Sequence, residues 1–369
     1  MHTSPVTPPT ARAAGFAGRL RVSLRAVAEL VATPLLPTDF LDLLAPLRSR
    51  TDLRAKIVAV RPETADAATV VLRPGPAWQP HLPGQYLRIG VDVNGVRQWR
   101  AYSITSAPNR PDGLVTITVK AIEDGTVSRH LVRDARVGTV VQLDQAAGAF
   151  TLPATAPDKT LFIVAGSGVT PVMSMLRSRI DELDDVVVVH AASTESDAIF
   201  GSELRALAAT GQLTLIERFS DREGRIDPAA LPTLVPDLSE RVTWACGPAG
   251  LLDAIEARFD GEGRADQLHV ERFRPTVVEP GAGGTVSFVA SGTDVEVDGS
   301  TSLLDAGEAA GVLMPSGCRM GICFGCVSPL RSGAVRDLRT GELTTATDGD
   351  DISVQTCINT AASACEIDR

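Results

Sequence analysis

The alternation of apolar and polar positions divides the 369-residue chain into regions of different texture. Between residues 51 and 153, short apolar runs alternate as β-strands do, and turn dipeptides such as Asn94-Gly95 and Asp112-Gly113 separate them. The six runs are KIVAV, ATVVLRP, QYLRIGVDV, RQWRAYSIT, LVTITVKAI and TVVQL. This spacing predicts a small closed antiparallel β-barrel over residues 51–153.

Residues 154–274 have a different pattern, in which buried-type strands alternate with helical segments. The strands are TLFIVAG, DVVVVHAA, LTLIERF and RVTWACG, and the helices are VMSMLRSRIDEL, SELRALAAT and LLDAIEARF. Such alternation predicts a parallel sheet with helices on both faces. The stretch VVEPGAGG then predicts a linker over residues 275–284, and residues 285–369 form a third compact unit.

Residues 1–50 form a leader that begins with a Pro-, Ala- and Thr-rich stretch. A stripe of apolar residues with arginines around it predicts an amphipathic helix between Gly18 and Ala32. The stripe consists of Leu20, Leu24, Val27, Leu30 and Val31. Two interpretations stay open. The helix packs on the chain's own barrel, or it docks on a membrane surface where Arg19, Arg21 and Arg25 meet anionic headgroups.

Composition and charge narrow the class of protein. Hydrophobic residues make up 44% of the chain, and no apolar run approaches the roughly 18 residues that span a bilayer. The net charge of −10 argues against a nucleic-acid partner. Residues 285–369 hold twelve acidic residues, five arginines and no lysine, so this unit carries about −7. The negative charge of this unit either steers it electrostatically towards a basic partner protein or is a solvated acidic surface without a binding role.

Five of the six cysteines lie in the last region, which is unlike a disulfide framework and indicates a metal site in a reducing compartment. Cys318-x4-Cys323-x2-Cys326, with Cys357 thirty residues later, has the spacing of a plant-type [2Fe–2S] cluster, which needs four thiolates. A structural zinc site is the alternative, but only one cysteine knuckle is present. Cys365 is either a bystander or an exchange ligand. The cytoplasm is the expected location.

Two further motifs lie in the barrel region. Arg100-Ala101-Tyr102-Ser103 ends a strand, and Gly125-Thr126-Val127-Ser128 opens a helical stretch. A flavin dinucleotide needs a guanidinium for its phosphates, an aromatic face for its ring and a helix N-terminus for the remaining charge. Alone, the first motif is a weak match. The two motifs together predict a flavin site.

The α/β region carries a glycine loop, Gly166-Ser167-Gly168-Val169-Thr170-Pro171, between a strand and a helix. This context predicts a cradle for dinucleotide phosphates. Cys246-Gly247-Pro248 follows the last strand, and in a parallel sheet both turns fall at the carboxyl edge, where ligands bind. Cys246 alone is equally well explained as an ordinary buried thiol.

With these four signatures in order, the chain resembles the ferredoxin–NADP reductase superfamily, in the branch with a C-terminal [2Fe–2S] domain. The resemblance covers residues 54–369 and implies an antiparallel β-barrel FAD domain, an α/β nucleotide domain and an α+β, β-grasp ferredoxin-like domain. The G-x-x-S helix start favours FAD over FMN. The resemblance also implies that Arg100 contacts the FAD diphosphate, that Tyr102 packs on the flavin, and that Ser103 hydrogen-bonds near N5.

Further site residues come from the same resemblance. It implies that Thr118, Val119 and Lys120 line the FAD, that Thr126, Val127 and Ser128 bind its diphosphate, and that Cys246 lies near the nicotinamide. Plant-type reductases end on an aromatic residue that covers the flavin. Because this chain continues into another domain, no such residue is assigned.

NADPH is preferred to NADH as the expected donor. An enzyme for NADH often places an acid directly after the second strand, but here Ala191-Ala192-Ser193-Thr194 follows and Glu195 comes later. Hydroxyls of Ser193 and Thr194, with Arg222 or Arg225, suit a 2′-phosphate.

The expected function is electron transfer from NADPH through FAD and the cluster to a separate oxygenase-type acceptor. The segment TPLLPTDFLDLLAPLRS is similar to actinobacterial reductases that serve membrane acyl-CoA desaturases or alkane hydroxylases, which implies a peripheral contact at the inner membrane face. One alternative is the NADH-dependent reductase of a soluble Rieske-type oxygenase. Another, of a different class, is a redox sensor or interaction module without turnover.

Overall fold

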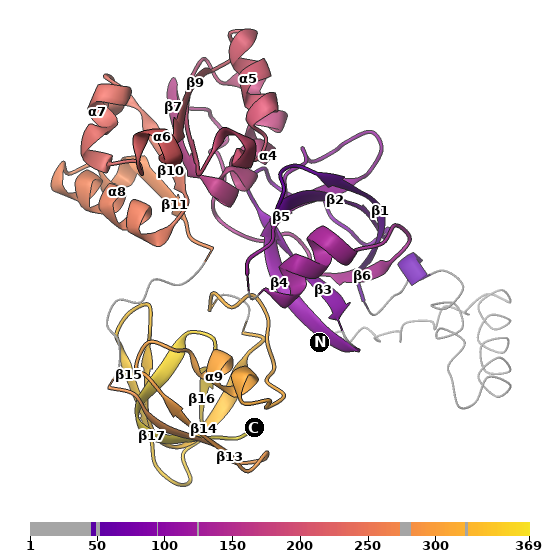
Figure 1. Cartoon of the computed structure of the whole chain (residues 1–369), viewed down its shortest axis with the longest axis vertical. Coiled ribbons are helices and arrows are strands. Elements are labelled where there is room, and N and C mark those ends of the chain that lie inside the picture. Colours follow the sequence, from indigo (N-terminus) through magenta and orange to yellow (C-terminus); the bar gives the residue numbers. More distant parts are fainter. Residues whose placement is uncertain (1–45, 49–51, 94, 124, 274–281, 322–323) are drawn as a thin grey trace, which may run out of the picture.

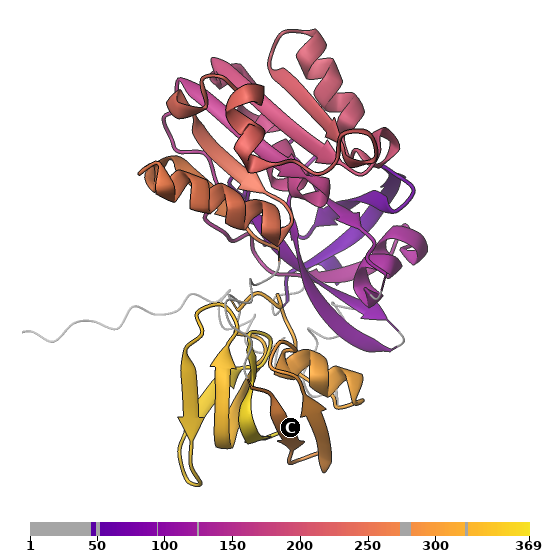
Figure 2. The same cartoon turned by 60° about the vertical axis from the view of Figure 1, so that its left-hand side comes forward.

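The computed structural model describes residues 46–48, 52–93, 95–123, 125–273, 282–321 and 324–369. The leader helix expected between residues 18 and 32, most of the expected linker, and Cys323 lie outside these residues. The described part forms three domains, coloured along the chain in Figures 1 and 2. In both views the C-terminal domain, in yellow, lies below the other two. Within the described residues, no helix is both long and apolar enough to cross a bilayer.

The first domain is an antiparallel sheet whose six strands correspond to the six predicted runs. They are β1 (Arg54–Pro62), β2 (Ala67–Pro74), β3 (Tyr86–Val93), β4 (Val96–Ser103), β5 (Val115–Lys120) and β6 (Val140–Leu143), in the order β4-β3-β6-β1-β2-β5. A bridge between Ile104 and Ile117 joins the end of β4 to β5, so the two outer strands approach each other. Helix α3 (Thr126–Arg129) continues as a π-helical turn, His130–Asp134.

Side-chain alternation in β5 separates the core of this domain from its ligand face. Val115, Ile117 and Val119 are buried in the hydrophobic core. Thr118 and Lys120 point to the opposite face, because successive residues of a strand alternate.

The second domain is a five-stranded parallel sheet, as the alternating pattern predicts. Its strands are β7 (Lys159–Ala165), β8 (Asp185–Ala192), β9 (Thr214–Phe219), β10 (Val242–Cys246) and β11 (Leu268–Glu271), in the order β11-β10-β7-β8-β9. The helices are α4 (Val169–Arg179), α5 (Gly201–Ala209), α6 (Ser220–Glu223), α7 (Leu231–Leu234) and α8 (Ala249–Gly261). Strand β11, at the edge of the sheet, is not among the predicted strands.

Both faces of this sheet are buried, which explains its continuous apolar strands. Phe162 and Val188 pack with α4 and α5 on one face, and Ile163 and Val189 pack with α7 and α8 on the other.

Helix α4 also fixes the second domain to the first. Arg177 donates to the Thr105 carbonyl (2.6 Å), and the Ser174 hydroxyl donates to the Ser106 carbonyl (2.9 Å).

The third domain is a mixed sheet crossed by one helix. Its strands are β12 (Gly284–Phe288), β13 (Thr293–Val297), β14 (Val327–Asp337), β15 (Leu343–Ala346), β16 (Ile352–Gln355) and β17 (Asn359–Ile367), and its helix is α9 (Leu303–Ala309). Strands β12 and β17 pair in parallel, and the other pairs are antiparallel. The three-domain fold class predicted from the sequence is therefore confirmed.

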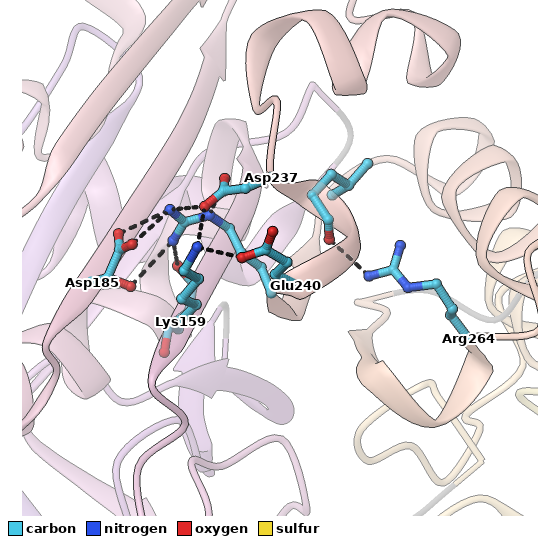
Figure 3. A network of polar contacts seen from close by, with 8 residues as sticks. Lys159, Asp185, Asp237, Glu240 and Arg264 are labelled. Carbon is cyan, nitrogen blue, oxygen red and sulfur yellow. Dashed lines mark hydrogen bonds and ion pairs between the residues drawn. The ribbon is translucent and has the colours of Figure 1, made fainter.

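A network of charged side chains closes the edge of the parallel sheet opposite to its carboxyl ends (Figure 3). Arg241, whose side chain is only 5% exposed, pairs with Asp185 (2.9 Å) and Asp237 (2.8 Å). Lys159 reaches Asp237 (3.0 Å) and Glu240. The hydrogen bond from Arg241 lowers the pKa of Asp237 to about 2, so this pair stays charged through the physiological range.

Replacing Arg241 by alanine is expected to lower the free energy of unfolding by roughly 2–3 kcal/mol, because hydrogen bonds to charged groups contribute about 1.5–3 kcal/mol. Lys159→Ala, at the exposed side of the same network, is the matched control and should cost less than about 1 kcal/mol. Urea unfolding followed by circular dichroism compares the two variants. Equal losses would contradict the dominant role of the buried arginine.

Candidate cofactor and electron-transfer site

One cavity of about 750 Å³ is lined by residues of all three domains. Its volume lies within the usual range for sites that bury a ligand of cofactor size. The first domain contributes the ends of β4 and β5 and the start of α3, and the second contributes the β7–α4 loop and the end of β11. The third contributes the start of α9 and two of the predicted cluster cysteines.

The residues that the flavin motifs single out gather at this cavity. All of them line it except Val119 and Thr126; those that do are Arg100, Ala101, Tyr102, Ser103, Thr118, Lys120, Gly125, Val127 and Ser128. The Val119 side chain is fully buried in the core of the barrel, because it alternates with Thr118 and Lys120 along β5. Thr126 begins α3 and does not line the cavity.

Local hydrogen bonds hold the first-domain side of the cavity in place. Arg100 donates through Nη1 to the Trp99 carbonyl (2.8 Å), and the Thr118 hydroxyl lies 2.7 Å from that of Thr69. Burial raises the pKa of Tyr102, so its hydroxyl stays protonated at neutral pH. A guanidinium, an aromatic ring and a helix start thus face one space, the set that a flavin dinucleotide requires.

Glycine fits the turn that opens α3 without displacing a neighbouring side chain. A Cβ on Gly125 would lie 2.3 Å from both Ile122 Cγ1 and Ser128 Oγ. The Ser128 hydroxyl donates to the Gly125 carbonyl (3.1 Å) and accepts the Ile122 N–H (3.3 Å). This compact turn leaves the first N–H groups of the helix available for an anion.

Of the predicted nucleotide residues, only Ser167 and Thr170 line the cavity. The others lie at or near the carboxyl edge of the sheet without lining it: Gly166, Gly168, Val169, Pro171, Ser193, Cys246, Gly247 and Pro248. Cys246 is fully buried, and burial raises the pKa of its thiol well above the ordinary value. A Cβ on Gly168 would lie 2.0 Å from the Cys246 carbonyl oxygen, so these two loops touch through backbone.

Sequence reasoning missed two cavity residues at the end of β11, Glu271 and Phe273. Glu271 lies opposite Cys246 in the parallel register, and burial raises the pKa of its carboxyl to about 7. Phe273 is an aromatic residue at the end of the second domain, although no such residue is assigned from the sequence. The sequence LHVERF contains both residues, but its strand is too short and too polar to stand out.

Three of the four predicted cluster ligands lie together and are buried, namely Cys318, Cys326 and Cys357. The hydrogen bond with Cys326 is the main cause that raises the pKa of the Cys357 thiol well above its ordinary value, and burial is the second cause. The nearby Cys318 acts in the same direction. Three crowded thiols are unfavourable as free thiolates, and bound iron relieves that cost. The Met320 N–H donates to Cys318 Sγ (3.3 Å). These residues therefore fit an iron–sulfur cluster.

The predicted cluster cysteines differ in whether they line the cavity. Cys318 and Cys357 line the cavity, whereas Cys326 does not. Cys365 packs in the hydrophobic core of the third domain, on β17, where burial raises its pKa to about 11. Sequence reasoning also missed the cavity residues Ser302, Asp305 and Arg319 of this domain, because no motif indicates how one domain packs on another.

Comparison with known families identifies the same three units. Residues 71–152 match the oxidoreductase FAD-binding domain, residues 162–257 the oxidoreductase NAD-binding domain, and residues 288–366 the 2Fe-2S iron-sulfur cluster binding domain. Phthalate dioxygenase reductase, described as a modular structure for electron transfer from pyridine nucleotides to [2Fe–2S], shares the fold. Its TM-score is 0.61 at 23% identity, over 88% of this chain and 99% of the other.

Several curated proteins are similar over most of their length. An NADPH oxidoreductase of Mycobacterium tuberculosis is 47% identical over 94% of this chain and 92% of the relative. NADH oxidoreductase HCR of Escherichia coli is 32% identical over 79% of this chain and 90% of the relative. The ferredoxin reductase component of 3-ketosteroid-9-alpha-monooxygenase from M. tuberculosis is 31% identical over 79% and 85%. The chain therefore belongs to the ferredoxin–NADP reductase superfamily, in the branch with a C-terminal [2Fe–2S] domain, and is an NAD(P)H oxidoreductase.

Proposed function

We propose that this chain oxidises NADPH and delivers the electrons to a separate oxygenase-type acceptor, namely a membrane acyl-CoA desaturase or alkane hydroxylase. The observation that carries the electron route is the cavity shared by the three domains. Flavin-motif residues, Ser167 of the nucleotide loop, and the cluster cysteines Cys318 and Cys357 all face it. A nicotinamide, a flavin and a cluster held by these residues would therefore lie next to one another.

When bound, FAD would accept one hydride, and with it two electrons, and would pass these electrons one at a time to the [2Fe–2S] cluster. The chain supplies position and charge. Arg100 would neutralise the FAD diphosphate and Tyr102 would pack on the flavin ring. Ser103, which is buried at the end of β4, would donate a hydrogen bond to the flavin near N5. The β7–α4 loop offers backbone N–H groups to the dinucleotide phosphates.

The preference for NADPH rests on the end of β8. No carboxylate follows that strand directly, and the Asp221 N–H donates to the Ser193 carbonyl (3.1 Å), which brings the β9–α6 segment beside Ser193. Arg222 in this segment is 62% exposed and lies 3.8 Å from Glu195. An exposed guanidinium in this segment suits a 2′-phosphate. The 47% identical relative named as an NADPH oxidoreductase supports the same preference.

Replacing Arg222 by alanine should lower kcat/KM for NADPH about 10- to 100-fold and leave that for NADH unchanged, since hydrogen bonds to charged groups contribute about 1.5–3 kcal/mol. Arg258→Ala is the matched control, because Arg258 pairs with Glu262 (2.7 Å) in the last turn of α8, in the same domain. Steady-state kinetics with both nucleotides measure the effect. A wild-type specificity constant that is higher for NADH would refute the NADPH preference.

A second candidate function is the NADH-dependent reductase component of a soluble Rieske-type oxygenase. Relatives near 30% identity favour it, because their names place them in oxygenase systems. They include the 3-ketosteroid-9-alpha-monooxygenase component and the glycine betaine monooxygenase reductase subunit of Pseudomonas aeruginosa. Both candidates share the same electron route within the chain and differ in the nucleotide that donates the electrons and in the acceptor.

Deleting residues 1–35 tests whether the acceptor is bound to a membrane or soluble. If the leader docks the enzyme at a membrane, the truncated enzyme should reduce cytochrome c at the full rate but support a membrane-bound desaturase or hydroxylase poorly. Activity assays with both acceptors, alongside FAD content and thermal stability, measure the difference. Loss of FAD or of stability would instead assign the leader to the folded core, and unchanged rates would refute the docking role.

A further inference from the structure

Arg319 directly follows the first cluster ligand and lines the cavity from the side of the third domain. Its backbone has a φ of 60°, a left-handed conformation that non-glycine residues rarely adopt. The guanidinium donates to Asp305 Oδ1 (2.6 Å) and to both carboxylate oxygens of Glu308. The cluster loop at Cys318 is therefore tied to α9 by one arginine with two acidic partners.

Helix α9 is itself anchored, so it can serve as a fixed support for this loop. The Ser302 hydroxyl accepts the Asp305 N–H (3.1 Å) and donates to Asp305 Oδ2 (2.7 Å). The Leu304 N–H donates to the Thr356 carbonyl (3.0 Å), directly before Cys357. Thr356 also donates through Oγ1 to the Cys326 carbonyl (3.0 Å). One chain of contacts thus connects the segments of Cys318, Cys326 and Cys357.

Arg100 of the first domain lines the same cavity. Burial lowers the pKa of Arg100, and the positive charge of Arg319 acts in the same direction, whereas Glu308 and Asp305 oppose it. The two guanidiniums are thus within electrostatic reach across the domain boundary. Asp305 and Glu308 neutralise one of them, which leaves Arg100 to the diphosphate and lets the two domains approach.

We propose that Arg319 is a positioning residue for electron entry into the cluster: paired with Asp305 and Glu308, it holds Cys318 at the wall of the flavin cavity. This inference rests on the electron route of the proposed function. Each transfer moves one electron from the reduced flavin to the oxidised cluster and breaks no covalent bond. Its rate therefore depends on how the two groups are placed and on their potentials.

Arg319→Ala in the full-length holoenzyme tests the proposal. Stopped-flow absorbance after mixing with NADPH should show an unchanged rate of flavin bleaching. Bleaching of the cluster should slow by roughly 10-fold, since the rate of electron transfer depends on how the two groups are placed. Arg319→Lys should restore part of the rate. The midpoint potential of the cluster, from an anaerobic redox titration, should stay close to that of the wild type.

Arg331→Ala is the matched control. Arg331 also forms an ion pair in the third domain, with Asp368, but it does not line the cavity. It should leave both rates unchanged. If the Arg319→Ala protein does not retain the cluster, the same measurement is made on the double variant Asp305→Asn/Glu308→Gln, in which electron transfer from flavin to cluster should also be slower.

The proposal is overturned if either variant, with its cluster intact, transfers electrons at the wild-type rate. It is also overturned if a changed cluster potential accounts for the loss, or if Arg331→Ala has the same effect. Failure of NADPH to bleach the flavin in the wild type would instead refute the proposed function, independently of Arg319.

Discussion

Replacing Cys318, Cys326 or Cys357 by serine is expected to abolish the visible absorbance of the cluster while FAD stays bound. The three thiols are buried, and a serine hydroxyl does not replace a cysteine thiolate as a ligand of the iron. Reduction of cytochrome c should fall to near background, because single electrons leave through the cluster. Flavin bleaching by NADPH should persist, since the flavin-motif residues belong to another domain.

The same replacement of Cys323, which completes the predicted motif, should behave alike. Cys365→Ser is the matched control: Cys365 is equally buried, but it lies on β17, opposite Val286 of β12 and Gly333 of β14. Its variant should keep the cluster. Iron analysis and visible spectra decide the outcome. Loss of the cluster in Cys365→Ser together with its retention in Cys357→Ser would refute the ligand assignment.

Replacing Gly168 by alanine is expected to impair the nucleotide domain strongly. The new Cβ would lie 2.0 Å from the Cys246 carbonyl oxygen and 3.0 Å from the Gly247 nitrogen, so the β7–α4 and β10–α8 loops must move apart. Such overpacking costs about 1–3 kcal/mol of stability. Displacement of the phosphate cradle should slow flavin reduction by NADPH about 10- to 100-fold.

Gly250→Ala is the matched control for this substitution. Gly250 lies in α8 of the same domain, and a Cβ there would meet no atom within 4 Å. Because alanine is favoured over glycine in a helix by roughly 0.5–1 kcal/mol, this variant should be as stable as the wild type or more stable. Thermal unfolding and stopped-flow reduction compare the two. Equal behaviour of both variants would contradict the close approach of the two loops.

The strands and the domain order could be predicted from the sequence because their signals are local. The barrel runs alternate with period two, and the buried strands of the parallel sheet are continuously apolar. Strand β11 escaped prediction because its four residues, LHVE, are partly exposed and carry no continuous apolar run. Because this strand was not predicted, the sequence also did not indicate Glu271, at its end, and Phe273, just beyond it, as cavity residues.

The cavity itself could be predicted only in part. Motif spacing brings the flavin residues to the ends of strands, and strand alternation alone would have separated Val119 from Thr118 and Lys120. The residues of the third domain that complete the cavity, such as Ser302 and Arg319, are placed by the packing of one domain on another. That packing depends on contacts between residues far apart in the chain, for which a single sequence carries no periodic signal.

Anaerobic stopped-flow mixing of the holoenzyme with NADPH tests the electron route most directly. The absorbance of the flavin should bleach first, and that of the [2Fe–2S] cluster should follow as electrons pass from one to the other. In Cys326→Ser only the flavin should bleach. Bleaching of the cluster without prior reduction of the flavin, or no bleaching of the flavin by NADPH or NADH, would contradict electron transfer through the shared cavity.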